Sequence, residues 1–313
     1  MHAVTIADGS VEWRAHPDPS PGAGELLVAV RAAGLNGADM MQRQGLYPAP
    51  PGAPADIPGL ELAGEVVDVG SGVQRFRTGD RVMAVVGGGA QAELAVVHER
   101  TAIPVPDGIS WEEAGGFPEV FTTAHDALFT QCGLAMSERV LVHGAAGGVG
   151  TAGVQLGVAT GAQVTATVRN PDLRDGVAAF GAVAVAPDAF AAHGPFDVVL
   201  ELVGAPNLAA NLDALAVGGR IAVIGVGAGA VAELNLFSLM GKRAHIHGST
   251  LRARPLEQKA DAARRVEAHV LPLLRDRRVT VPVAATFTMA DAGAAYDHFT
   301  AGGKLGKVVL RAG

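Results

Sequence analysis

The sequence predicts an α/β protein in which a β-rich domain is joined to a doubly wound α/β domain. The chain has 313 residues, more than a single hydrophobic core usually supports. The first hundred or so residues are short β-branched stretches between glycines and prolines, and from about residue 117 strand-like runs alternate with helical patterns. We therefore expect one domain at 1–118, completed by 253–313, and a second at 119–252.

The first domain is expected to contain antiparallel strands. Four stretches have the composition and bounding turns of strands: 25–33, 62–69, 81–86 and 93–97. After the second domain, apolar residues at helical spacing predict one helix over 254–275. A final strand at 307–310 is expected to return to the first domain.

The second domain is expected to contain a parallel sheet. Six strand-like runs are separated by helical patterns: 139–143, 163–168, 183–186, 197–200, 220–224 and 244–248. Strand, helix and strand at this spacing favour right-handed crossovers on a doubly wound sheet.

Composition and charge exclude several classes of protein. Hydrophobic residues make up 49% and charged residues 18%, which is typical of a globular enzyme. A net charge of −7 gives no basic surface for nucleic acid. The single cysteine, Cys132, excludes an intrachain disulfide and fits a reducing compartment. No signal peptide or membrane-spanning run is found, so we expect a cytoplasmic protein without a membrane partner.

A glycine-rich loop is the most specific motif in the chain. The strand-like Val140-Leu141-Val142 leads into residues 143–150, HGAAGGVG, and an apolar helical row follows. Glycines let a backbone approach phosphates, and a helix N-terminus offers unpaired amides and a positive dipole end. We expect Gly147, Gly148, Val149 and Gly150 to bind the pyrophosphate of a dinucleotide.

The end of the next strand predicts which dinucleotide is bound. A site for NADH would present an acidic residue there, but the sequence is Thr167-Val168-Arg169-Asn170. Arg169 offers a planar cation suited to a 2′-phosphate, with Asn170 and Arg174 beside it. We therefore expect NADPH, with a solvated surface arginine as the alternative.

Four segments resemble a known family. They are 34–39 with 42–47, 59–64, 144–150 and 303–308. The chain resembles the zinc-free quinone oxidoreductase branch of the medium-chain dehydrogenase/reductase superfamily, which includes zeta-crystallin. It is most similar to the tumour-suppressor-inducible quinone oxidoreductase group. The resemblance implies a GroES-like catalytic domain and a Rossmann NADPH-binding domain.

The resemblance also allows a prediction about bound zinc. In zinc-dependent members a cysteine ligand would stand near Asn36 and a histidine at the position of Leu60, with four further cysteines near 87–89. Asparagine and leucine cannot replace thiolate and imidazole as zinc ligands. We therefore expect no bound zinc and no zinc-assisted alcohol dehydrogenase chemistry.

Site residues follow from the glycine loop, from Arg169 and from the resemblance. We expect Tyr47 and Asn36 to be catalytic. Tyr47 could instead be a loop aromatic packed on prolines, and Asn36 a turn residue. The expected cofactor-binding residues are Asn36, Thr123, Gly147, Gly148, Val149, Gly150, Arg169, Asn170, Gly225, Val226, Lys304 and Lys307.

The expected reaction is hydride transfer from NADPH, bound in an interdomain cleft, to a quinone. Tyr47, Asn36 or backbone amides would stabilise the developing oxyanion. Two alternatives stay open: a reductase of enals, enones or enoyl thioesters, and a non-catalytic NADPH-binding protein resembling crystallins. An apolar edge strand at 244–248 predicts a homodimer.

Overall fold

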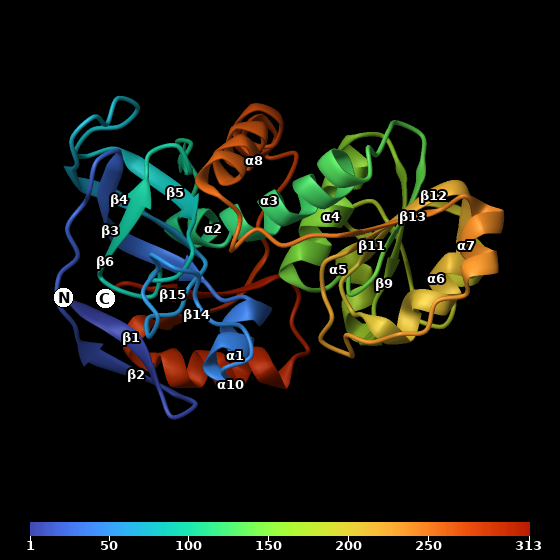
Figure 1. Cartoon of the computed structure of the whole chain (residues 1–313), viewed down its shortest axis with the longest axis horizontal. Coiled ribbons are helices and arrows are strands. Elements are labelled where there is room, and N and C mark those ends of the chain that lie inside the picture. The colour runs from blue at the N-terminus through green and yellow to red at the C-terminus, as the bar shows by residue number, and fades with distance from the viewer. The chain divides into compact units, whose positions relative to one another are not determined.

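A computed structural model describes residues 1–313 and divides them into two compact units. Unit 1 comprises residues 1–119, 251–302 and 307–313, and unit 2 comprises 120–250 and 303–306 (Figure 1). From the sequence, 303–306 are expected in the first domain. In the structure they belong to unit 2, because the Gly306 N–H donates to the Ala146 carbonyl at 2.8 Å and Gly306 forms a parallel bridge with Gly147.

Unit 1 is built on a seven-stranded sheet. Its order is β14-β15-β3-β4-β5-β7, and β6 also pairs with β3. The strands are β3 (Glu25–Gly34), β4 (Glu61–Val69), β5 (Arg81–Val85), β6 (Leu94–His98), β7 (Ala102–Pro104), β14 (Val283–Thr288) and β15 (Lys307–Arg311). Every pair is antiparallel except β14–β15. The four strands predicted for this domain are confirmed, as is the return of the C-terminal strand.

A hairpin that the sequence analysis did not predict precedes this sheet. It joins β1 (His2–Ala7) to β2 (Ser10–Ala15). Asp8 and Gly9 form its turn with φ of 48° and 78°, and two consecutive positive φ angles give the tight hairpin turn that an Asp-Gly pair favours.

The core of unit 1 follows from the alternation of side chains along β3. Leu26, Val28 and Val30 are buried, and the residues between them are partly exposed. They pack with residues of β4, β5 and β15 and with Tyr296. The helices of this unit are α1 (Gly37–Arg43), α2 (Trp111–Gly115), α8 (Leu256–His269), α9 (Leu271–Arg275) and α10 (Ala292–Ala301).

The segment 254–275 is helical, but the prediction of one continuous helix over it is wrong. The structure has two helices, α8 and α9, which meet at Val270. Pro272 stands in the first turn of α9, where its missing N–H is tolerated. Inside one continuous helix its ring would clash with the carbonyl four residues earlier, so the chain ends one helix and begins another.

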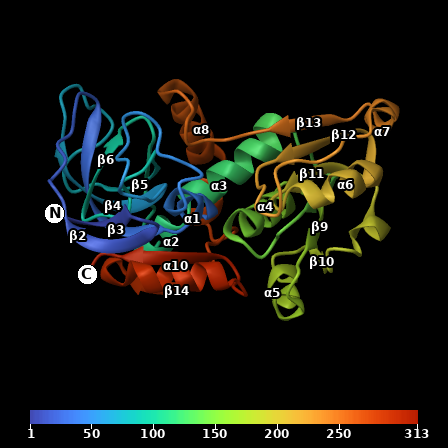
Figure 2. The ribbon, with the colours of Figure 1, turned by 60° about the horizontal axis from the view of Figure 1, so that its bottom comes forward.

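Unit 2 is a six-stranded parallel sheet with the order β10-β9-β8-β11-β12-β13. The strands are β8 (Arg139–Val142), β9 (Gln163–Thr167), β10 (Val183–Val185), β11 (Phe196–Glu201), β12 (Leu215–Val223) and β13 (His245–Gly248). Figure 2 shows β10 and β13 at opposite edges of the sheet. The predicted parallel, doubly wound fold is confirmed, and the strand order reverses between β8 and β11.

Helices connect the strands of unit 2. They are α4 (Gly148–Ala159), α5 (Arg174–Ala178), α6 (Leu208–Ala214) and α7 (Leu236–Lys242). Before β8, α3 (Pro118–His125) continues from unit 1 into a π-helix at Asp126–Gln131. Apolar side chains of β8, β11 and α6, with Phe190, form a core against this sheet. No helix of the protein combines the length and apolar character that crossing a bilayer requires.

Candidate active site

The glycine loop joins β8 to the N-terminus of α4. Gly147 is the N-cap residue, with φ −75° and ψ 170°, and no side chain caps the helix. The first backbone bond of the helix runs from the Thr151 N–H to the Gly147 carbonyl at 2.8 Å. The amides of residues 148–150 therefore have no intrahelical acceptor, which is the arrangement that binds an anion.

Two of the loop glycines have different surroundings. A Cβ at Gly150 would lie 2.5 Å from the Gly144 carbonyl oxygen and 2.6 Å from the Ala145 Cα, both backbone atoms. A Cβ at Gly147 would come no closer than 3.5 Å to the atoms around it. Gly150 is thus needed for the turn itself, whereas the space beside Gly147 is open.

The end of β9 carries two arginines. Arg169 is exposed. The Arg174 Nε–H donates to the Val168 carbonyl at 3.2 Å, so this second guanidinium is held at the same strand end. Asn170 uses its Oδ1 to accept the Asp172 N–H at 3.1 Å and caps a short 3-10 helix.

The loop after β12 contains Gly225 and Val226. A Cβ at Gly225 would lie 2.4 Å from the Leu202 carbonyl oxygen, so glycine is required here by the packing of the chain itself. Val226 is 39% exposed. Lys304 lies in the segment 303–306, which unit 2 holds against the glycine loop through Gly306.

A buried cluster in unit 1 surrounds Lys307, and we call Lys307, Glu61, Asn36 and Asp39 the Lys307 cluster. The Lys307 ammonium donates to Glu61 Oε1 at 2.6 Å, to the Leu35 carbonyl at 2.6 Å and to Asn36 Oδ1 at 2.8 Å. Lys307 is 3% exposed and Glu61 0%. All three ammonium hydrogens are used, so a cofactor contact by Lys307 would require one of these bonds to break.

The cluster fixes the orientation of the Asn36 amide. Its Oδ1 accepts from Lys307, and its Nδ2 donates to Glu61 Oε1 at 3.0 Å and to the Gly34 carbonyl at 3.2 Å. Lysine only donates and a carboxylate only accepts, which assigns the two ends of the amide. Both N–H bonds are used, so Asn36 retains acceptor capacity alone. Donation from Asn36 to an oxyanion is therefore not supported by this arrangement.

Asp39 completes the cluster beneath Asn36. It is fully buried and accepts the Asn36 N–H at 2.8 Å and the Gly59 N–H at 3.1 Å. Burial raises the pKa of Asp39 from 3.8 to about 6, although both hydrogen bonds and Lys307 oppose the rise. Between these two values the folded chain binds a proton that the unfolded chain does not, so this carboxyl favours folding more as the pH falls through that range.

Tyr47 belongs to a second group in unit 1, which we call the Arg252 clamp: Arg252, Gln42, Tyr47 and Gly87. The Arg252 guanidinium donates to the Gly87 carbonyl at 2.7 Å, to the Tyr47 carbonyl at 2.8 Å and to Gln42 Oε1. It also lies 5.1 Å from the centre of the Tyr47 ring. The predicted Tyr47 is half-buried, and only its backbone oxygen accepts a bond from this clamp.

Thr123, Leu60 and the histidine that opens the glycine loop, His143, are buried. Thr123 lies on α3 and is 8% exposed. His143 is 1% exposed and bonds the Thr167 hydroxyl at 2.9 Å and Asn211 Oδ1 at 2.7 Å, and burial lowers its pKa. Leu60 is 2% exposed. No group of three or more His, Cys, Asp or Glu side chains is arranged to hold a metal ion.

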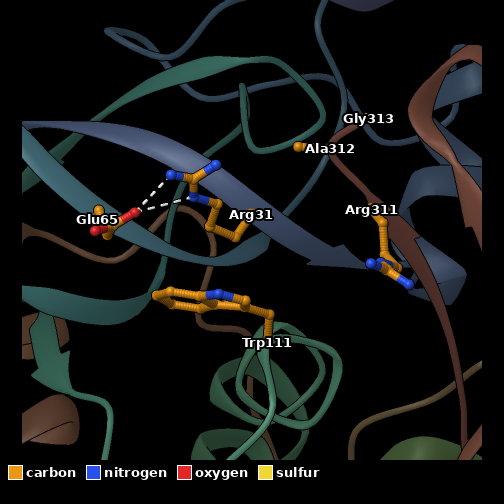
Figure 3. A pocket seen from close by; sticks show the side chains of 6 residues that line it. All are labelled: Arg31, Glu65, Trp111, Arg311, Ala312 and Gly313. Atoms are coloured by element: carbon orange, nitrogen blue, oxygen red, sulfur yellow. Dashed lines mark hydrogen bonds and ion pairs between the residues drawn. The ribbon is translucent and has the colours of Figure 1, made fainter.

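A cavity of about 300 Å³ in unit 1 contains none of the predicted site residues. Figure 3 shows the Trp111 ring below the Arg31–Glu65 ion pair, with Arg311 to one side. The Arg31 Nη2 lies 2.6 Å from Glu65 Oε2, and Arg81 covers a face of Trp111 with its guanidinium carbon 4.2 Å from the ring centre. These are surface ion pairs and a cation–π contact, which explain the arrangement without a ligand.

The structure thus divides the predicted site residues into two groups. Asn36, Tyr47 and Lys307 belong to unit 1, where Asn36 contacts Lys307 directly. The remainder belong to unit 2. Sequence reasoning missed Arg252 as a neighbour of Tyr47, Gln42 as an acceptor for the same guanidinium, and Glu61 as a partner of Asn36. No local pattern points to these contacts, although Gln42 stands in one of the segments that carry the resemblance.

Comparison with known proteins supports this organisation. Residues 22–107 match the alcohol dehydrogenase GroES-like domain, and residues 148–268 match the family described as zinc-binding dehydrogenase. A quinone oxidoreductase of Pseudomonas aeruginosa is 33% identical over 315 residues, covering 96% of this chain and 95% of that protein. The polyketide synthase GfsB of Streptomyces halstedii is 39% identical over 221 residues, which are 69% of this chain and only 4% of the synthase.

A solved structure shows the same fold over the whole length. The native structure of mycobacterial Rv1454c complexed with NADPH has a TM-score of 0.88 and 27% identity, covering 99% of this chain and 100% of that one. A GroES-like unit and a Rossmann unit with a glycine loop define an oxidoreductase that uses a dinucleotide. The chain belongs to the medium-chain dehydrogenase/reductase superfamily, in its quinone oxidoreductase branch.

Proposed function

We propose that the protein uses NADPH, without zinc, to reduce a quinone. The observation that carries the cofactor assignment is the end of β9, where two arginines and no acidic residue of the strand stand in the position that would meet the adenosine ribose. The uncapped N-terminus of α4 and the open side of Gly147 fit a pyrophosphate.

Different residues of the chain would then bind the cofactor and stabilise the acceptor oxygen. NADPH supplies a hydride when bound, and one further proton completes the reduction of a quinone to a hydroquinone. The amides of α4 bind phosphate oxygens, and Asn36 Oδ1 accepts a hydrogen bond from a hydroxyl of the cofactor or substrate. The Tyr47 hydroxyl donates to the acceptor oxygen as negative charge develops on it.

Zinc independence rests on the chemistry of the side chains near Asn36. The Asn36 amide is engaged by a lysine and a carboxylate, and Leu60 provides no donor atom. We expect elemental analysis of the purified protein to find no stoichiometric zinc, and we expect quinone reduction to be unchanged after incubation with a chelator. One zinc per chain, with activity lost on chelation, would contradict this assignment.

Tyr47→Phe is expected to lower kcat/KM for a quinone by about tenfold or less. One net hydrogen bond contributes about 0.5–1.5 kcal/mol, which corresponds to about tenfold or less in rate, and water can supply the proton. Steady-state kinetics with NADPH and a simple para-quinone measure this. A loss beyond a thousandfold would make Tyr47 an obligatory acid and would favour the second candidate function.

The second candidate is reduction of an activated alkene, such as an enone or an enoyl thioester. The similarity to the polyketide synthase GfsB over 69% of the chain favours it. In this reaction hydride goes to a β-carbon, and an acid protonates the α-carbon. A panel of quinones, enals and enoyl thioesters compared by kcat/KM discriminates between the two candidates, and we expect the quinones to be the better substrates.

We also propose a homodimer that forms through the edge strand β13. Ile246 on this strand is 37% exposed, and α7 just before it exposes Leu236, Phe237 and Met240 to 63%, 86% and 68%. An exposed apolar edge is normally covered, and a two-fold axis would extend the sheet across two copies. We expect light scattering at micromolar concentration to give the mass of two chains, and Phe237→Asp to shift it toward one. A wild-type monomer would contradict the proposal.

A further inference from the structure

Arg252 is a buried cation without a carboxylate partner. Its relative exposure is 4%, and its three hydrogen bonds go to two backbone carbonyls and one amide oxygen. Arg31 and Arg220, in contrast, each form an ion pair with a glutamate. Burying a charge without a direct ion pair is unfavourable, and desolvation lowers the pKa of Arg252, although the charges of Asp39 and Glu119 oppose that shift. A neutral side chain could fill the same space without this desolvation cost, so the burial of a charged side chain here requires an explanation.

The contact between Arg252 and the ring of Tyr47 offers that explanation. The guanidinium lies 5.1 Å from the ring centre, while the same group bonds the Tyr47 carbonyl and Gln42. Arg252 therefore fixes the loop at both the backbone and the aromatic face. A planar guanidinium suits this double contact because it can stack and donate in its plane at once.

The charge also acts on the phenol. Burial raises the pKa of Tyr47, Arg252 opposes that rise, and Glu119 adds to it. Asp39 and Glu119 are the carboxylates whose charges reach Arg252. Without the arginine, the phenol would sit in a partly buried site whose remaining nearby charge is negative, and it would be a poorer hydrogen-bond donor.

We propose that Arg252 is a positioning residue for Tyr47, which holds the tyrosine loop in place and sets a buried positive charge against the phenol so that negative charge at the acceptor oxygen is stabilised. This inference rests on the proposed role of Tyr47 in reduction. It adds a residue outside the glycine loop and outside the segments expected to touch the cofactor.

The first test measures the phenol directly and needs no substrate. The chain has two tyrosines, Tyr47 and Tyr296, so ¹³Cζ-tyrosine NMR gives two signals, and Tyr296→Phe assigns them. We expect Arg252→Met to move the Tyr47 titration to higher pH. Arg43→Met is the matched control, because Arg43 lies 5.5 Å from the centre of the Tyr296 ring, and it should leave the Tyr47 titration where it is.

The second test is a double-mutant cycle on quinone reduction. Arg252→Met should lower kcat about tenfold with little change in the KM for NADPH, and Arg252→Lys, which keeps the charge, should recover part of that loss. In the Tyr47→Phe background, Arg252→Met should have little further effect, because the two residues act together. Should the methionine variant not fold, Arg252→Gln, which keeps a polar contact, replaces it in both tests.

The outcomes separate this inference from the proposed function. An unmoved Tyr47 titration, or activity losses that simply add in the cycle, would overturn the role of Arg252. A shifted titration in a protein that prefers enoyl thioesters to quinones would keep the role of Arg252 and reject the quinone.

Discussion

Replacing Lys307 by methionine is expected to lower the free energy of unfolding by about 3–5 kcal/mol, because it leaves a buried carboxylate without its partner. Glu61 is fully buried, and its Oε1 would lose the ammonium at 2.6 Å. The Asn36 Oδ1 would lose its donor as well. Urea unfolding at neutral pH, followed by circular dichroism, measures the loss.

The control for Lys307→Met is an exposed ion pair whose glutamate lies on β4, the strand that also carries Glu61. Glu65, four residues along β4 from Glu61, pairs with Arg31 at 2.6 Å, but the two side chains are 38% and 47% exposed. Solvent-exposed ion pairs contribute about 0–1 kcal/mol, so Arg31→Met should be nearly neutral. Equal losses from the two variants would mean that burial of the Lys307 cluster does not decide its contribution.

Arg169→Ala is expected to remove most of a preference for NADPH over NADH that we predict to be at least tenfold in kcat/KM. A guanidinium–phosphate contact at a partly exposed site contributes about 1.5–3 kcal/mol, which is roughly tenfold to a hundredfold in affinity. Use of NADH should be nearly unchanged, since NADH has no 2′-phosphate. Kinetics with each cofactor at saturating quinone measure both values.

A second exposed arginine of unit 2 serves as the control. Arg243, in the left-handed C-cap position of α7, is remote in sequence from β9, and Arg243→Ala should leave the cofactor preference intact. If the wild-type protein used both cofactors equally, or if Arg169→Ala weakened both alike, Arg169 would be a surface arginine and the cofactor assignment would fail.

Local patterns were enough to predict the parallel sheet of unit 2, five strands of the unit 1 sheet and the succession of strand, glycines and helix at the glycine loop. Strand alternation along β3 and the succession of strand, glycines and helix at 140–150 depend on neighbours a few residues away. The signals for the β1–β2 turn at Asp8-Gly9 and for the break at Pro272 were also local, but they were not used. These two errors could have been avoided from the sequence.

The surroundings of the candidate catalytic residues could not be predicted in this way. Lys307 reaches Asn36 across 271 positions of the chain, and Arg252 reaches Tyr47 across 205. Which buried cation meets which acceptor depends on how β15 and the segment before α8 pack against β3 and α1. Hence Asn36 was expected to donate, whereas the fold uses both of its N–H bonds.

Every tryptophan and tyrosine of the chain lies in unit 1: Trp13, Trp111, Tyr47 and Tyr296. Tryptophan and tyrosine fluorescence therefore originates in the GroES-like unit alone, and the Rossmann unit contributes none of it. Far-ultraviolet circular dichroism responds to the unfolding of both units. Denaturation followed by both signals would give superimposable curves if the units unfold together. Curves that separate would yield a stability for each unit from a single unlabelled sample.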